Sequence, residues 1–98
     1  LDISNNQFTG DIPVELHELK NLKSVNLSFN YFNGEIPLEL LNLDSLEIFY
    51  MHENNLRGIL PEKLCLHNPQ LKIIIWGNSF CPPYPVCIKY IGSQECKN

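Results

Sequence analysis

The fold of this chain is decided by the segment LKNLKSVNLSFNYFNGEIPLELLNL, residues 19–43. Its residue types return every 24 positions along the chain, as from Asn30 to Asn54. A fixed period of this length indicates stacked coils, none of which buries its apolar side alone. We therefore expect function on a surface shared by several coils. Five columns keep this register: Asn6, Asn30, Asn54 and Asn78; Phe8, Phe32, Leu56 and Phe80; Gly10, Gly34 and Gly58; Pro13, Pro37, Pro61 and Pro85; Leu16, Leu40, Leu64 and Ile88.

Each coil is predicted to contain a short strand followed by a turn. Val25 and Leu27 enclose the polar Asn26, and this alternation with period two is typical of a strand with one buried face. Four such strands, at residues 1–4, 24–28, 48–52 and 72–76, are expected side by side in one parallel sheet. The Asn column should bond backbone groups where the chain bends, the Gly column should provide a turn, and the Leu column should fill the back of the core.

The repeated unit resembles the plant-type extracellular leucine-rich repeat, whose pattern is LxxLxxLxLxxNxLxGxIPxxL. The resemblance implies an α/β fold: a right-handed solenoid with a parallel β-sheet on its concave face and short helical or irregular turns on its convex face. We expect repeats at residues 1–77, with a truncated first coil, and a cap at residues 78–98. Because Leu1 begins in mid-strand, we also expect the remainder of a longer leucine-rich-repeat chain on the N-terminal side.

Charge and hydropathy exclude two classes of partner. The chain has 98 residues, a formal net charge of −4 and no basic cluster, so nucleic acid is not an expected partner. No apolar run approaches the length of about 20 residues that a membrane span requires, so this segment is not expected to insert into a membrane.

The four cysteines indicate a disulfide-stapled end in an oxidising, extracellular setting. The segment after Asn78 resembles the cysteine-containing caps of secreted leucine-rich-repeat proteins. We predict that Cys65 pairs with Cys87, because the two residues flank equivalent inward positions of adjacent coils, within the roughly 6 Å between Cα atoms that a bridge requires. Cys96 is then left to bring the tail back to Cys81. Pairing of Cys81 with Cys87 through the proline-rich loop is the open alternative.

The sequence does not favour a metal site or catalysis. A zinc site at Cys65, His67 and the later cysteines would need gaps of two to four residues, whereas Cys81 and Cys87 are separated by five and Cys87 and Cys96 by eight. No metal and no cofactor is therefore expected. His52 and Glu53 are adjacent without an obvious nucleophile beside them, so the chain is not expected to be an enzyme.

The triplet Asn26-Leu27-Ser28 is the only acceptor sequence for N-glycosylation in the chain. Asn26 is expected to point outward from the sheet, where a glycan would restrict the binding face. The alternative is that the repeat pattern produces this triplet by chance.

The outward strand positions predict a binding site near the end of the chain. Small polar residues dominate the first two coils, whereas Tyr50, His52, Ile74 and Trp76 gather on the last two, with Phe29 and Glu53 at the border. Exposed aromatic residues are typical anchors of protein interfaces. The alternative is that the C-terminal tail folds back and buries Ile74 and Trp76. The three columns read Asp2, Asn26, Tyr50 and Ile74; Ser4, Ser28, His52 and Trp76; Asn5, Phe29, Glu53 and Gly77.

These patterns predict extracellular recognition, with a protein or peptide ligand on the concave face. The resemblance implies a peptide hormone, a pathogen-derived protein, a wall-degrading enzyme or a co-receptor as the ligand. The competing hypothesis is a structural or adhesive spacer that binds nothing in particular, which the polar face of the first two coils favours.

Overall fold

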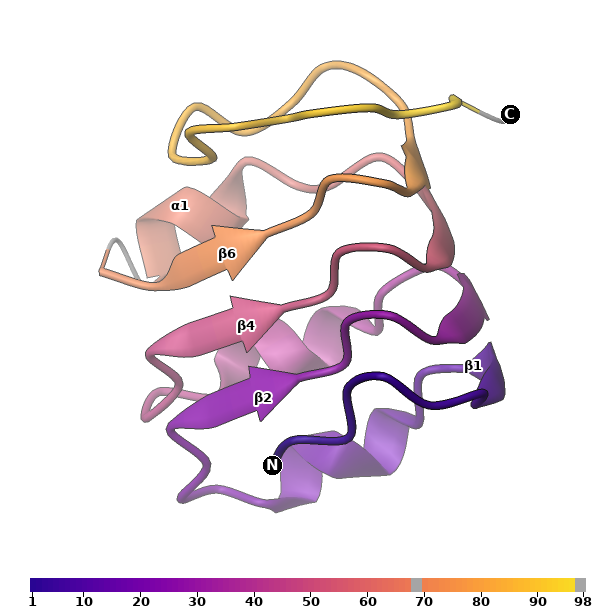
Figure 1. Cartoon of the computed structure of the whole chain (residues 1–98). Coiled ribbons are helices and arrows are strands. Elements are labelled where there is room, and N and C mark those ends of the chain that lie inside the picture. The colour runs from indigo at the N-terminus through magenta and orange to yellow at the C-terminus, as the bar shows by residue number, and fades with distance from the viewer. Residues whose placement is uncertain (68–69, 97–98) are drawn as a thin grey trace.

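The computed structural model of the chain describes residues 1–67 and 70–96. Its coils stack in chain order from the N-terminal to the C-terminal end (Figure 1), in a body of 32 × 30 × 19 Å. One set of strands forms the front of the stack in this view, a second set runs along its right-hand edge, and short helical turns lie behind. The predicted α/β solenoid is confirmed.

The first sheet contains the strands β2 (Ser24–Asn26), β4 (Ile48–Tyr50) and β6 (Lys72–Ile74), all parallel and in this order. The predicted alternation holds, because Val25 and Phe49 are buried while their strand neighbours are half-buried. Residues 1–4 lie beside β2 as predicted but do not form a regular strand. Asp2 and Asn26 form a parallel bridge, and the Ile3 N–H donates to the Asn26 carbonyl at 3.0 Å.

The structure contains a second parallel sheet, which the sequence does not predict. Its strands are β1 (Thr9–Asp11), β3 (Tyr31–Gly34), β5 (Asn55–Gly58) and β7 (Ser79–Phe80), in the order β1-β3-β5-β7. These segments contain the Gly column, and apolar and polar residues do not alternate along them as they do in a half-buried strand. From the sequence alone they therefore indicate a turn. Pairing between equivalent segments of adjacent coils holds them extended.

The convex side carries the 3₁₀ helices η1 (Val14–Glu18) and η2 (Leu38–Asn42) and the α-helix α1 (Lys63–His67). Pro13 and Pro37 precede the 3₁₀ helices with φ of −63° and −60°, the values to which the proline ring restricts the backbone. Leu40, Leu64 and Ile88 are buried, as the Leu column predicts, whereas Leu16 in the first coil is half-buried.

The Asn column forms a hydrogen-bond ladder along the stack. Asn54 Oδ1 accepts a bond of 3.0 Å from Phe32 N–H in the preceding coil. Its Nδ2 donates to the carbonyls of Leu27 and Met51, at 2.9 and 3.2 Å. Asn30 and Asn78 repeat this arrangement. Each buried asparagine therefore joins two adjacent coils, and the expected role of this column is confirmed.

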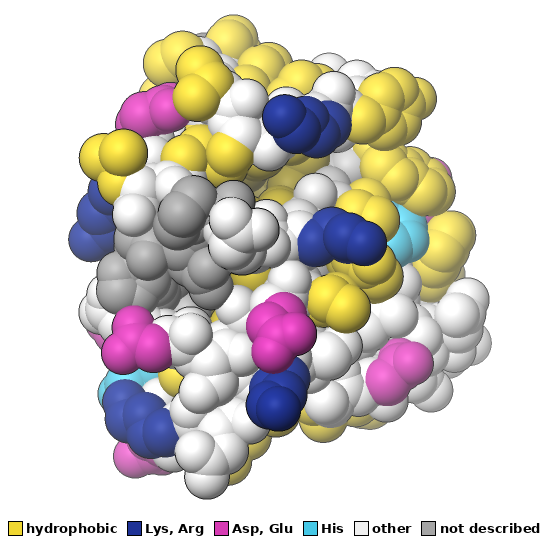
Figure 2. All heavy atoms as spheres, turned by 90° about the vertical axis from the view of Figure 1, so that its left-hand side faces the viewer, with side chains coloured by type: hydrophobic (Ala, Val, Ile, Leu, Met, Phe, Trp, Pro, Cys, Tyr) yellow, Lys and Arg dark blue, Asp and Glu magenta, His cyan; other side chains and the backbone are white. Residues whose placement is uncertain are grey.

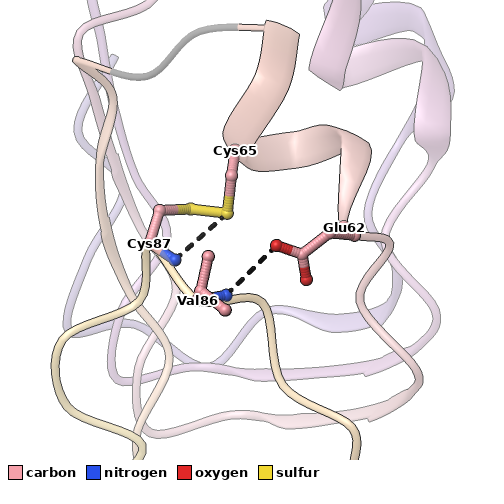
Figure 3. Close-up of a disulfide and its surroundings, with 4 residues drawn as sticks. All are labelled: Glu62, Cys65, Val86 and Cys87. Carbon is pink, nitrogen blue, oxygen red and sulfur yellow. Dashed lines mark hydrogen bonds between the residues drawn. A yellow bond between two sulfur atoms is a disulfide. The ribbon is translucent and has the colours of Figure 1, made fainter.

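The two disulfides are Cys65–Cys87 and Cys81–Cys96, with Cα separations of 5.5 and 4.6 Å. They are the pairs expected from the sequence, and the rival pair Cys81–Cys87 is absent. Around the first of them (Figure 3), the Cys87 N–H donates to Cys65 Sγ and the Val86 N–H to Glu62 Oε1. The last coil is thus attached to α1 through the disulfide and one hydrogen bond, and to the residue before α1 through the other.

The C-terminal tail, residues 89–96, covers the end of the stack. Gln94 takes the place of the next asparagine in the ladder: its Oε1 accepts from Phe80 N–H at 2.9 Å, and its Nε2 donates to the Ile75 carbonyl at 2.8 Å. Asn78 and Gln94 form a parallel bridge. The boundary between repeats and cap at residue 77 stays a prediction, since the same ladder continues across it.

Candidate ligand-binding site

The structure brings four of the predicted site residues into one group, which we call the aromatic cluster: Phe29, Tyr50, His52 and Trp76. The His52 ring lies in the middle, with its centroid 4.6 Å from Trp76, 5.3 Å from Phe29 and 6.0 Å from Tyr50. Phe29 and Trp76 also meet edge to face, at 6.1 Å. These separations are typical of favourable aromatic pairs, so the four side chains form a continuous surface across three coils.

Phe29 and Glu53 occupy a different kind of position from the one expected. Both have a left-handed backbone, with φ of 56° and 57°, at the bend where the chain leaves the first sheet. They are therefore not outward strand residues, because the chain has already turned toward the second sheet. The bend directs Phe29 onto His52 and Trp76 while leaving 43% of it exposed. Gly77 occupies the same position in the last coil, with φ of 72°.

Ile74 and Trp76 are not sealed by the described part of the tail. The tail approaches Trp76 closely at Gly92, where an added Cβ would overlap the Cβ of Trp76. Gly92 also has a φ of 65°, which side chains rarely tolerate. Both Ile74 and Trp76 nevertheless stay half-buried. The tail thus meets Trp76 at its Cα and Cβ, and the aromatic cluster remains accessible.

The environment of His52 favours its neutral form. Burial lowers the pKa of His52 below its ordinary value of 6.5, and the neighbouring Glu53 carboxylate opposes this shift only in part. The Nδ1 atom is buried without a hydrogen-bond partner among the described residues. His52 therefore acts as an aromatic member of the cluster rather than as a cation.

Acidification is expected to destabilise the fold through His52. Because its folded-state pKa is depressed, the unfolded chain takes up a proton first as pH falls below about 6.5, and the free energy of unfolding falls with it. The measurement is urea unfolding of the chain and of His52→Phe at about pH 7.5 and 5.5, on either side of the ordinary histidine pKa. The loss should be smaller in His52→Phe. An equal or larger loss in the variant would contradict this assignment.

The other predicted sites have simpler surroundings. Asn26 is half-buried in β2, and its Oδ1 accepts bonds from the Ser28 N–H and hydroxyl, at 3.0 and 2.6 Å. Its glycosylation stays a prediction.

The sulfur atoms that the alternative zinc site would need are bonded to each other in disulfides. Among residues 1–67 and 70–96, no group of three or more potential metal ligands is present.

The sequence matches the family model described as Leucine Rich Repeat over residues 1–19, 21–43 and 45–67. The chain belongs to the leucine-rich repeat family. No curated protein sequence matches the chain significantly. Its leucine-rich repeats nevertheless superpose on those of several solved structures.

Three solved structures illustrate the similarity. The BIR2 ectodomain from Arabidopsis thaliana has a TM-score of 0.80 and 31% identity, covering 89% of this chain and 46% of that chain. A chain of the BIR3–SERK2 complex from Arabidopsis thaliana has a TM-score of 0.79 and 27% identity, covering 89% and 47%. The PEPR1–AtPEP1 structure has a TM-score of 0.79 and 34% identity, covering 89% and 12%. The present chain thus spans about half the length of the first two.

These findings place the chain among the plant-type extracellular leucine-rich-repeat proteins, with a cysteine-containing cap at the C-terminal end. Within the part of the chain that the structure describes, no helix has the length and apolarity needed to cross a bilayer.

Proposed function

We propose that this chain is an extracellular or cell-surface recognition module, which binds a protein or peptide ligand through the aromatic cluster on the concave face of the β2-β4-β6 sheet. The observation that carries the proposal is the cluster itself. Four aromatic rings contact one another across three coils and yet remain partly exposed. A soluble protein rarely exposes such a group unless something docks on it.

Two further observations support the proposal. The similar repeats include one chain of a complex between two proteins, BIR3 and SERK2, and one in a structure with AtPEP1. The two disulfides are typical of proteins exported to an oxidising compartment. The proposal includes no enzymatic activity and no cofactor.

A spacer function is the second candidate, and the first two coils favour it. On this part of the sheet face the polar side chains satisfy each other. The Ser4 hydroxyl donates to Asp2 Oδ1 and the Ser28 hydroxyl donates to Asn26 Oδ1, both at 2.6 Å. Such pairs offer a ligand few free groups, so any binding should concentrate on the aromatic cluster.

Removing one aromatic anchor is expected to weaken ligand binding by roughly thirtyfold, which corresponds to about 2 kcal/mol. The chain is first used to probe a panel of secreted peptides and extracellular domains. The dissociation constant of the captured ligand is then measured for Trp76→Ala and Phe29→Ala. Phe29→Ala is the cleaner variant, because Trp76 also contacts the tail at Gly92.

Lys20→Ala is the matched control, since Lys20 is exposed on the connecting segment before β2. Its dissociation constant should equal that of the parent chain. Equal affinity of all three variants would exclude the aromatic cluster as the binding site. A failure of every probe to bind would favour the spacer function.

A further inference from the structure

The outer edge of β6 is open. In the parallel ladder Lys72 pairs with Ile48 and Ile74 with Tyr50, so these two β6 residues direct their N–H and C=O groups toward β4. The backbone groups of Ile73 therefore point away from β4, and no described residue bonds to them. The tail reaches this edge only beyond Ile74, where Gly77 N–H donates to the Ser93 carbonyl at 2.9 Å.

A pocket of about 420 Å³ lies along this open edge, between β6 and the start of the tail. Ile73, Ile74 and Trp76 line it from the strand side, and Tyr90 lines it from the tail side. Figure 2 faces the side of the molecule on which β6 begins, and it shows hydrophobic side chains within a hollow that basic side chains border. The volume falls within the range of ligand-binding pockets, roughly 300–1,000 Å³.

The charge at this pocket is opposite to that of the whole chain. Lys72 and Lys89 both line it and are exposed, and none of the described lining residues is acidic. The chain as a whole has a formal net charge of −4. A local pair of lysines beside an apolar hollow therefore complements a segment with both acidic and aliphatic side chains.

We infer that the open edge of β6 and its pocket form a second binding site, for an extended peptide segment of a partner protein in which acidic residues flank aliphatic ones. The segment adds a strand to β6 by pairing with both backbone groups of Ile73. One aliphatic side chain enters the pocket, and the acidic side chains lie near Lys72 and Lys89. Strand addition of this kind derives affinity from the backbone and specificity from the pocket.

The backbone geometry favours a peptide over a small carboxylate. Only another extended backbone satisfies the N–H and the C=O of Ile73 together. The described tail does not take this place, because its parallel bridge to the last coil lies further on, at Asn78 and Gln94. The inference is independent of the aromatic cluster, apart from Trp76, which lines the pocket and also belongs to the cluster.

The probe is the blocked peptide acetyl-Glu-Val-Leu-Val-Glu-amide, titrated into the ¹⁵N-labelled chain and followed by NMR. We expect the largest shifts at Lys72, Ile73, Lys89 and Tyr90, and slower hydrogen exchange at the Ile73 amide. The dissociation constant should rise at least tenfold for the double variant Lys72→Glu/Lys89→Glu, and also for the same peptide with lysine in place of glutamate.

Lys20→Glu/Lys23→Glu carries the same change in charge on exposed residues outside the pocket, and it should bind the peptide as the parent does. Phe29→Ala should also leave this binding unchanged, which separates the site from the aromatic cluster. The inference would be overturned if no shifts appeared at peptide concentrations up to about 10 mM, because the dissociation constant would then be too high for useful binding. Shifts in the pocket with unchanged exchange at Ile73 would overturn strand addition in favour of simple pocket filling.

Discussion

Asn54→Ala is expected to lower the free energy of unfolding by about 3 kcal/mol, because each buried polar group left without a partner costs about 1–3 kcal/mol. The substitution removes the acceptor of Phe32 N–H and a donor to the Leu27 carbonyl. Asn54 is only 7% exposed, so water does not readily replace it. For a domain of this size the melting temperature should fall by roughly 12 °C or more. Urea and thermal unfolding measure both quantities.

Asn6→Ala is the matched control from the same column. Asn6 Nδ2 donates to the carbonyls of Ile3 and Ser4, but the residue is exposed and water can take its place. Its loss should stay below about 1 kcal/mol. Asn54→Asp tests the donor separately, since a carboxylate would face the Leu27 carbonyl without a proton to offer. If Asn54→Ala and Asn6→Ala cost the same, the ladder does not stabilise the stack as we describe.

Removing the Cys65–Cys87 disulfide is expected to cost about 3 kcal/mol, the value that chain entropy predicts for a closed loop of about this length. The two cysteines are 22 residues apart, and Cys65 is buried in a small apolar cluster with Leu64. The variant is Cys65→Ser/Cys87→Ser, measured by urea unfolding under non-reducing conditions. The Cys81–Cys96 bond is left intact.

Hydrogen exchange locates this effect within the stack. Because repeats are stabilised by their nearest neighbours, amides of α1 and β6 should lose protection first, while those of β2 stay as slow as in the parent. Uniform loss of protection along the chain would contradict this local role. A loss of stability below about 1 kcal/mol would contradict the entropic argument.

Much of the architecture could be predicted from the sequence, because the repeat is regular. The 24-residue spacing of Asn30, Asn54 and Asn78 predicts the hydrogen-bond ladder. The Leu column predicts the buried residues at the back of the core. The positions of Tyr50, His52 and Trp76 on one face followed from the two-residue period of strands. The Cys65–Cys87 pair followed from the register of adjacent coils, and Cys81–Cys96 was the pair that remained.

The second sheet could not be predicted, because its strands have almost no local signal. Asn55 and Gly58 are poor strand formers, and only pairing with equivalent segments keeps them extended. The role of Gln94 is similar. Nothing in its sequence surroundings marks it as the last member of the ladder, since it lies 16 residues after Asn78 rather than a full repeat.

The sequence by itself determined the stacking of coils, the family and the set of residues that share one face, since all of these depend on a period. Tertiary structure decided what is exposed. The path of the tail leaves Trp76 half-buried and the edge of β6 open at Ile73. It also leaves an apolar pocket beside Lys72 and Lys89. The tail is held by the Cys81–Cys96 bond and by Gln94, contacts between segments whose separation does not follow the repeat, so no periodic pattern encodes them.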